Sequence, residues 1–406
     1  MSDDAIQGAL SGIRVIDLSR ILAGPWATQM LADFGAEVIK VERPGQGDDT
    51  RGWGPPFFGD DEHKVAAYFH SANRGKQSIA IDFTRPEGQQ LVHDLVREAD
   101  VLVENYKVDG LKKYRLDYDS LKAINPRLVY CSITGFGQTG PYKHRAGYDF
   151  MIQGMGGLMS VTGEPDGTPM KVGVALTDIL TGLYAANAVQ AALHYRARTG
   201  LGQHIDLALL DVQVATMANQ AMNYLATGNS PGRLGNAHPN IVPYQAFATT
   251  DGYLILAVGN DGQFQRFCEV AGRPDLSADE RFATNQARVA HREQLLPVII
   301  ERMKTQTRDW WLDKLEAVSV PCGPINSLEQ VFADPQVQAR ELKRELNQPE
   351  LGKVPSVANP IRFSESTIHY ERAAPSLGSD TDHVLTGLLD CDASRLAFLR
   401  KQGIVG

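Results

Sequence analysis

Asp178 is the residue whose position points most directly to chemistry. The stretch 171–177 before it is apolar and predicts a strand, and a long helical pattern begins at Asp178. The positive end of a helix stabilises a first-turn carboxylate and keeps it ionised at neutral pH, as a carboxylate nucleophile requires. The alternative is that Thr177 caps the helix and Asp178 is an ordinary first-turn acid. Because such acids are common, the pattern by itself favours the alternative.

Basic residues at or near the ends of predicted strands form a second candidate site. They are Arg20, Arg43, Lys112, Lys113 and Arg145. The carboxyl ends of parallel strands meet at one edge of a sheet, so these cations would form a positive pocket for a polyphosphate ligand. Each of them alone is more often a solvated surface charge.

His238 and Tyr244 flank a proline-rich loop between a helical region and a predicted hairpin. Loops carry binding and catalytic residues more often than their share of the chain would suggest. We nevertheless favour a histidine whose hydrogen bonds are satisfied within its own loop.

Nucleotide and ester-hydrolysis motifs are absent or out of context. Residues 135–140 match the G-x-G-x-x-G spacing after a predicted strand, but Pro141 follows where a dinucleotide site needs a helix, so we predict a flexible turn. Residues 73–77 lack the first glycine and the Ser/Thr of an ATP-binding loop. No G-x-S-x-G elbow is present.

The order of predicted elements indicates an α/β fold with a parallel sheet and helices on its faces. Strands are predicted at 13–18, 37–41, 78–83, 100–103 and 128–134, and helices at 26–34 and 86–99. Gly35 is expected to end the first helix, since glycine accepts the left-handed conformation. Ligands are expected at the loops that follow the strands.

The second half of the chain predicts a different organisation. Two long helices, 178–198 and 207–226, are expected to be struts that do not cover the sheet, and Asp251-Gly252 predicts a hairpin within 244–258 because both residues tolerate positive φ. Further helices are predicted from residues 263, 279 and 309, and one at 393–402 that packs on the first domain. The predicted domains are a large domain (1–205), a helical linker (206–235), a smaller α+β domain (236–330), and a return linker that completes the large domain (331–406).

Composition excludes several classes of partner. The chain has 406 residues, with Lys+Arg 40 against Asp+Glu 48, a formal charge of -8 that argues against binding nucleic acid or anionic membranes. Four dispersed cysteines without a CxxC pair indicate neither a zinc site nor a disulfide framework, so no metal is expected. The N-terminal residues do not resemble a signal peptide, and there is no apolar run of spanning length. We therefore expect a cytoplasmic protein.

Taken together, the chain resembles the class III CoA-transferases, also called the CaiB/BaiF family, which include formyl-CoA transferase and carnitine CoA-transferase. The resemblance covers essentially the whole chain and rests on motifs in order. These are residues 12–18, 23–25, 36–45 with 47–48, 100–105, 125–127, 147–149, Asp178 with 181–182, 199–203 and 321–324.

This resemblance implies a Rossmann-like large domain and an interlocked, ring-like homodimer. The substrates would be an acyl-CoA and a small carboxylic acid, with no tightly bound cofactor. Asp178 matches the family's nucleophilic aspartate, which forms first a mixed anhydride with the acyl group and then an aspartyl-CoA thioester. Amides near 154–157, or those of the His238 loop, would stabilise the oxyanion.

The resemblance also assigns binding residues. Arg43 and Lys113 match CoA-phosphate contacts and Asn105 a residue of the CoA channel, while the remaining candidates for the CoA site are Arg20, Ala23, Arg145 and Tyr148. Arg20 and Leu22 differ from the His and Gln of formyl-CoA transferases. The loop 235–244, with His238 and Tyr244, lacks the glycine run of oxalate-specific members. It resembles instead the loop of succinyl-CoA-dependent transferases acting on glutarate and hydroxymethylglutarate.

Three alternatives remain at this point. An α-methylacyl-CoA racemase shares the fold but needs a histidine base in a Gly-His-Asp context, where this chain has Gly147-Tyr148-Asp149. A tyrosine, with an ordinary pKa of about 10, is a poor base near neutrality. A formyl-CoA:oxalate transferase and a non-catalytic acyl-CoA-binding protein are the other two.

Overall fold

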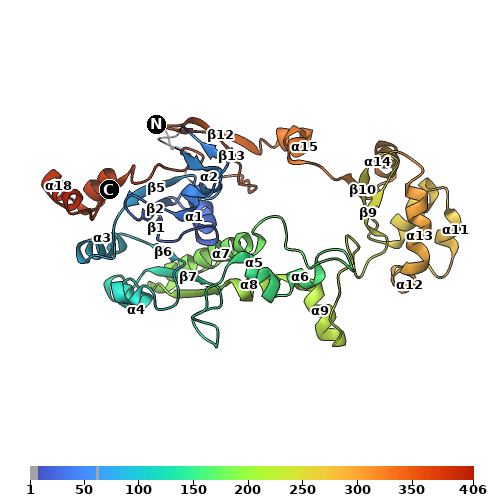
Figure 1. Ribbon diagram of the computed structural model, residues 1–406, viewed down its shortest axis with the longest axis horizontal. Helices are drawn as coiled ribbons and strands as arrows, with labels where there is room; N and C mark the ends of the chain where they lie inside the picture. The colour runs from blue at the N-terminus through green and yellow to red at the C-terminus, as the bar shows by residue number, and fades with distance from the viewer. Residues whose placement is uncertain (1–7, 61–63) are drawn as a thin grey trace. The chain divides into compact units, whose positions relative to one another are not determined.

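The computed structural model describes residues 8–60 and 64–406, which divide into two compact units (Figure 1). The large unit contains the residues up to Leu158, together with Val172–Ala218 and Gln336–Gly406. The small unit contains Met159–Lys171 and Asn219–Pro335.

A six-stranded parallel sheet forms the centre of the large unit, in the order β5-β2-β1-β6-β7-β8. The strands are β1 (Arg14–Asp17), β2 (Glu37–Glu42), β5 (Lys76–Ala80), β6 (Val101–Glu104), β7 (Val129–Thr134) and β8 (His204–Ala208). Counted along the chain this is the order 3-2-1-4-5-6 of Rossmann-type folds. The order reverses between β1 and β6, so the loops that follow these two strands flank the crevice where such sheets bind ligands.

Both faces of this sheet are buried. This explains why apolar residues follow one another along its strands and do not simply alternate with polar ones. Val15 packs in a core with α1 and α7, whereas Ile16 points into a second core with α3, α4, α17 and α18. The helices are α1 (Ala23–Asp33), α3 (Pro86–Arg97), α4 (Tyr118–Ile124), α7 (Leu176–Thr199), α17 (Thr381–Leu389) and α18 (Ala393–Lys401). The α/β prediction is confirmed, and Gly35 follows α1 with a φ of 95°.

The prediction that 178–198 is a strut is wrong. Ala185, Ala186, Val189 and Ala192 of α7 are buried against the sheet, because small alanine side chains allow the helix to approach it closely. The prediction of one continuous helix over 207–226 is also wrong. Its start belongs to β8, which pairs with β7, and the rest is divided between α8 (Leu209–Thr216) and α9 (Ala218–Thr227), with Ala218 at a φ of 43°.

The small unit has its own core under a three-stranded antiparallel sheet, β11-β10-β9. Its elements are α9, β9 (Tyr244–Ala248), β10 (Tyr253–Ala257), α10 (Asp261–Val270), α11 (Pro274–Ala278), α12 (Asn285–Ala290), α13 (Arg292–Met303), α14 (Arg308–Ala317), β11 (Cys322–Pro324) and α15 (Leu328–Ala333). The predicted hairpin is confirmed, but not its reason. Neither Asp251 nor Gly252 has a positive φ, and the Asp251 carboxylate instead accepts hydrogen bonds from Thr249 Oγ1 and the Arg308 amide.

The C-terminal segment returns to the large unit, as predicted. Leu396 and Leu399 of α18 lie in the same core as Ile16. The remaining elements are η1 (Asp49–Gly52), β3 (Phe57–Phe58), β4 (Val65–Ala66), α2 (Ala67–His70), η2 (Lys112–Tyr114), α5 (Asp149–Met155), α6 (Leu158–Val161), α16 (Pro335–Ala339), β12 (Lys343–Gln348) and β13 (Gly352–Val357). Within 8–60 and 64–406, no helix combines the length and apolarity needed to cross a bilayer.

Gly182 on α7 tests the close approach of α1 and α7. A Cβ at this position would lie 2.8 Å from the Ala23 carbonyl oxygen and 3.0 Å from Trp26. We expect Gly182→Ala to lower the free energy of unfolding in urea by about 1–3 kcal/mol, because a backbone atom cannot move aside easily.

Gly387→Ala is the matched control, since Gly387 also lies in a helix but has open space around its Cβ position. It should gain about 0.5–1 kcal/mol. A Gly182→Ala protein as stable as the wild type would contradict the packing described.

Candidate active site

Asp178 is the third residue of α7, but the elements around it differ from the prediction. Lys171–Ala175 is irregular and not a strand, and the Val172 amide donates to Gln153 Oε1 at 2.9 Å. Thr177 is not the cap either. The N-cap is Ala175, and Thr177 is buried with its hydroxyl donating to Gln213 Oε1 at 2.6 Å.

Asp149 supplies the cap that the sequence did not reveal. Its Oδ1 accepts the amide hydrogens of Thr177 at 2.8 Å and Asp178 at 3.3 Å. The buried Gln153 donates to Asp149 Oδ2 at 2.7 Å and so holds this carboxylate in place. The first amides of α7 are therefore bound by Asp149 and not by the Asp178 side chain.

The Asp178 carboxyl is held in its protonated form more strongly than expected. Burial, with the nearby Asp149 carboxylate adding to it, raises the pKa of Asp178 to about 7. The expectation that the helix end keeps Asp178 fully ionised at neutral pH is thus wrong. A carboxyl with this pKa is a stronger nucleophile when ionised than an ordinary aspartate, and about half of it is ionised near pH 7.

Tyr68 on α2 is a further polar group of this site that the sequence did not reveal. Burial and then the Asp178, Asp149 and Asp48 carboxylates raise the pKa of its phenol. The phenol therefore stays protonated and available as a hydrogen-bond donor. The Trp53 ring packs edge-on against Tyr68, with centroids 5.4 Å apart.

A cavity of about 270 Å³ lies at the crevice predicted by the strand order. Arg20 after β1 and Arg43 after β2 line it, together with the aromatic rings of Phe83 and Tyr106. Arg43 is exposed and its guanidinium donates to Gln46 Oε1, with no carboxylate partner among the described residues. This leaves a cation free to bind an anionic ligand.

Arg20 and Asn105 join the two loops that flank the crevice. The Arg20 amide donates to Asn105 Oδ1 at 2.9 Å, and Asn105 Nδ2 donates to the Arg20 carbonyl at 2.7 Å. The Arg20 side chain forms an ion pair of 2.8 Å with Asp49. Ala23 follows as the buried first residue of α1, beside Gly182, which lies one turn after Asp178 on α7. The predicted residues Arg20, Ala23, Arg43 and Asn105 are thus neighbours.

Other predicted residues do not line this cavity. Lys113 is exposed on η2 over the Tyr114 ring, and Lys112 pairs with Asp109. Arg145 lies over Tyr142 in the loop after β7, and Tyr148 is the exposed N-cap of α5, directly before Asp149. Their places were inferred from strand ends or resemblance, and long loops carry them away from the crevice.

His238 and Tyr244 belong to the small unit and contact each other, with ring centroids 5.2 Å apart. The Asn240 amide donates to His238 Nδ1 at 3.0 Å. Burial and the Arg292 cation lower the pKa of His238, so this is a neutral histidine satisfied within its loop, the interpretation favoured from the sequence.

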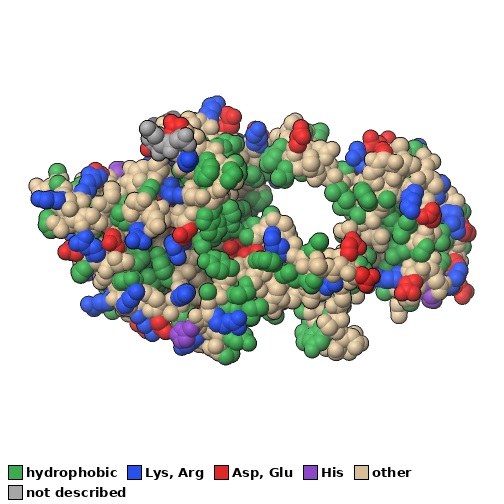
Figure 2. Space-filling model, in the orientation of Figure 1, with side chains coloured by type: hydrophobic (Ala, Val, Ile, Leu, Met, Phe, Trp, Pro, Cys, Tyr) green, Lys and Arg blue, Asp and Glu red, His purple; other side chains and the backbone are tan. Residues whose placement is uncertain are grey.

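The described residues contain no group of three or more His, Cys, Asp or Glu able to hold a metal ion. On the visible face of the large unit, Lys and Arg side chains are interspersed with Asp and Glu (Figure 2). The polar groups described at the site are two carboxyls, a phenol and a small group of cations.

Comparison with known proteins identifies the family. Residues 10–381 match the family model described as CoA-transferase family III. The chain belongs to CoA-transferase family III. This CoA-transferase is 59% identical to a succinate–glutarate CoA-transferase of Agrobacterium fabrum, over 93% of this chain and 95% of that protein. It is 43% identical to the human succinyl-CoA:glutarate CoA-transferase, over 98% and 90%.

A solved structure agrees with this assignment. A CaiB/BaiF family protein from Brucella suis has a TM-score of 0.83 and 55% identity, covering 94% of this chain and 100% of that chain. The likeness to class III CoA-transferases expected from the sequence is confirmed.

The raised pKa of Asp178 predicts a pH-dependent gain of stability in Asp178→Asn. The carboxyl keeps its proton in the folded CoA-transferase up to about pH 7, whereas the unfolded chain loses it near 3.8. Its contribution is therefore fully present below pH 3.8 and is lost as the pH rises through 7. We expect Asp178→Asn to melt at a higher temperature than the wild type at pH 8, with the difference shrinking toward pH 4.

Asp211→Asn is the matched control, because Asp211 is an exposed acid at the same first-turn position of α8. It should show no such gain at pH 8. Equal melting temperatures of Asp178→Asn and wild type at pH 8 would contradict this prediction. They would mean that burying the charged Asp178 carboxylate does not destabilise the folded protein.

Proposed function

We propose that this enzyme moves CoA from succinyl-CoA to a dicarboxylic acid of the size of glutarate, with Asp178 as the nucleophile. The observation that carries the proposal is the partly buried Asp178 carboxyl, with its pKa raised to about 7. It lies one helical turn before Gly182, which packs on Ala23 at the start of α1, and the loop before α1 carries Arg20 to the crevice cavity. The relatives at 59% and 43% identity are named for transfer between succinate and glutarate, which supports this donor and acceptor.

The first half of the reaction places the acyl group and then CoA on Asp178. The ionised carboxylate attacks the thioester carbonyl of succinyl-CoA, the C–S bond breaks, and a mixed anhydride and CoA thiolate result. The thiolate then attacks the Asp178 carbonyl of the anhydride. This releases succinate and leaves an aspartyl-CoA thioester.

The second half repeats these steps in reverse order with the acceptor. The acceptor carboxylate attacks the aspartyl-CoA carbonyl, forming a new anhydride and thiolate. The thiolate attacks the acceptor carbonyl, which gives the product thioester and frees Asp178. Water would hydrolyse both intermediates. The partial burial of Asp178 would therefore protect them, in addition to raising the pKa of the carboxyl.

Arg43 and Arg20 would bind the CoA phosphates, and the Phe83 and Tyr106 rings would pack on its adenine. A guanidinium without a carboxylate partner suits a phosphate, since it donates two parallel hydrogen bonds. Asn105 would line the CoA channel, with Ala23 at its inner end. Lys113, Arg145 and Tyr148 remain proposed CoA contacts that only a bound complex can test.

We propose His238 and Tyr244 of the loop 235–244 as contacts of the acceptor acid. We also propose that the predicted large domain, 1–205 and 331–406, binds CoA, although Met159–Lys171 within it belongs to the small unit, which extends over Asn219–Pro335 and not only 236–330. Tyr68, a protonated donor under the influence of Asp178, is suited to the anhydride or acceptor carboxylate. The four unpaired cysteines fit the reducing cytoplasm.

Transfer to a panel of acids tests the proposed reaction. With succinyl-CoA as donor, we expect glutarate and related dicarboxylates to accept CoA faster than oxalate, formate or acetate. Asp178→Asn should lose about 10³-fold or more of kcat, because an amide cannot form the anhydride, while still binding CoA. The Asp211→Asn control should transfer CoA at the wild-type rate.

Activity retained in Asp178→Asn would contradict the covalent route. Exchange of the α-proton of an acyl-CoA into deuterated water, without an acceptor acid, would favour the racemase alternative. We expect none, because the residue in the place of the racemase histidine is the exposed Tyr148.

We also propose that two copies form a homodimer. Large apolar side chains of the large unit are exposed, including Tyr184 and Tyr195 of α7, Leu201, and Val214 of α8. Hydrophobic side chains gather on part of the visible face of this unit (Figure 2). Exposed apolar side chains that gather on one surface are typical of a protein–protein interface.

Sedimentation equilibrium tests the homodimer. We expect a mass of twice the 44.4 kDa of the chain at micromolar concentration, because the exposed apolar side chains would be buried. A mass of one chain throughout would contradict the dimer and leave these side chains unexplained.

A further inference from the structure

The loop Ser19–Leu22 between β1 and α1 has an unfavourable backbone conformation. Ile21 has a φ of 71°, in the left-handed region that β-branched residues rarely adopt. A conformation of this kind persists only where surrounding contacts impose it. The same loop carries Arg20 to the crevice cavity and leads directly into α1 beside the first turns of α7.

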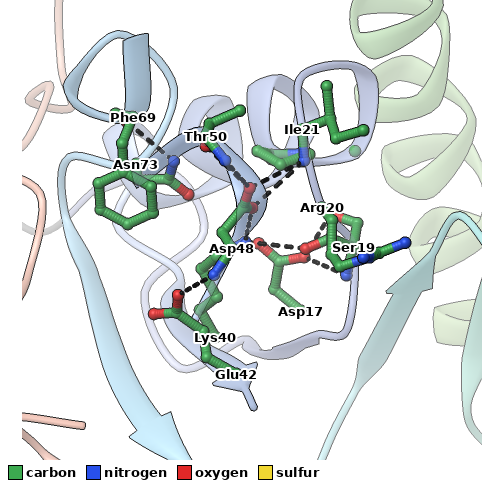
Figure 3. A network of polar contacts seen from close by, with 12 residues as sticks. Asp17, Ser19, Arg20, Ile21, Lys40, Glu42, Asp48, Thr50, Phe69 and Asn73 are labelled. Carbon is green, nitrogen blue, oxygen red and sulfur yellow. Dashed lines mark hydrogen bonds and ion pairs between the residues drawn. The ribbon is translucent and has the colours of Figure 1, made fainter. Parts of the chain in front are cut away.

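Asp48 supplies the contact that holds Ile21. The Ile21 amide donates to both carboxylate oxygens of Asp48, at 3.2 and 3.3 Å. Asp48 also forms an ion pair of 2.9 Å with Lys40, whose Nζ donates to the Ser19 carbonyl at 2.8 Å. The two charged side chains are fully buried, and together they bind the loop at two points (Figure 3).

Asp48 is itself held from the other side. Thr50 donates to its Oδ1 through the amide, at 3.0 Å, and through the hydroxyl, at 2.8 Å. The Asp48 amide donates to Glu42 Oε2 at 2.8 Å, and Glu42 pairs with Arg51 at 2.6 Å. Although burial raises it, Lys40 and the Thr50 hydrogen bonds lower the pKa of Asp48 overall, so the carboxylate remains charged.

We propose that Asp48 is a positioning residue of the acyl-CoA site, which fixes the strained Ile21 peptide and thereby presents Arg20 to the cavity. The proposal rests on the function proposed above, since it assigns the cavity to acyl-CoA. Among the described residues, Arg20 has further restraints in its backbone pair with Asn105, its side-chain pair with the exposed Asp49, and the Tyr106 ring, whose centroid lies 5.5 Å from its guanidinium carbon. Within the described part of the chain, Asp48 is the only acceptor for the Ile21 amide.

Asp48→Asn tests this role, because it keeps the shape of the side chain and removes its charge. We expect KM for succinyl-CoA and the dissociation constant of CoA to rise about ten-fold or more, as for loss of a charged hydrogen bond, with a smaller change in kcat. In the free protein, hydrogen exchange of the peptide containing Ile21 should become faster.

Asp33→Asn is the matched control for loss of a buried carboxylate. Asp33 pairs with Arg74 at 2.5 Å and is also buried, but it lies outside the cavity. This variant should leave KM unchanged. An equal rise of KM in Asp33→Asn would assign the effect to general destabilisation and overturn the proposal.

If Asp48→Asn folds poorly, the double variant Lys40→Met with Asp48→Asn still tests the proposal. Removing both buried charges should restore the melting temperature, because no unpaired ion remains, while KM stays raised. A return of KM to the wild-type value together with stability would overturn the proposal, as would an unchanged KM in the single variant. If wild-type protein neither binds CoA nor transfers it, the proposed function fails instead.

Discussion

The carboxylate of Asp149 accepts the amide hydrogens that begin α7, and the state of the active site follows from this contact. It satisfies the Thr177 and Asp178 amides from outside the helix. Asp149 therefore occupies the positive helix end, and Asp178 is left in a partly buried position, with the Asp149 charge adding to the effect of burial. Its pKa of about 7 is the result. The carboxyl is basic enough to attack a thioester and still partly ionised at neutral pH.

A second set of buried charges organises the opposite side of the crevice. Lys76 pairs with Asp17 at 3.0 Å, Lys40 with Asp48, and Arg51 with Glu42. Although burial opposes it, Lys76 and Lys40 hold the pKa of Asp17 at about 2, so these groups remain ions inside the protein. Buried ion pairs contribute little net stability, but breaking one is costly. They are well suited to fixing the loops at the ends of β1 and β2.

Much of the secondary structure of the large unit was predictable from the sequence, because it depends on residues that are close together in the chain. Apolar runs marked β1, β2, β5, β6 and β7, Gly35 marked the end of α1, and the tail helix carried the leucines that join the core. Errors arose where local pattern and tertiary contact disagree. Lys171–Ala175 has the composition of a strand but no neighbouring strand, and β8 looked helical because it runs directly into α8.

The site shows the same division. Arg20, Arg43 and Asn105 follow strands whose order places them together, so their proximity could be predicted. Asp149, Tyr68 and Asp48 could not, because each acts through contacts with residues 20 or more positions away in the chain. The position of Asp178 at the start of α7 suggested that the helix stabilises its charge. In the folded protein, a second acid, Asp149, binds the amides at that end of the helix instead.

The most direct measurement is the mass of the Asp178 peptide after reaction with succinyl-CoA and quenching with hydroxylamine. The account predicts a hydroxamate on Asp178 and on no other acidic residue, formed only when acyl-CoA is present and absent from Asp178→Asn. An unmodified Asp178 in a preparation that transfers CoA at its full rate would contradict the covalent role of this carboxyl.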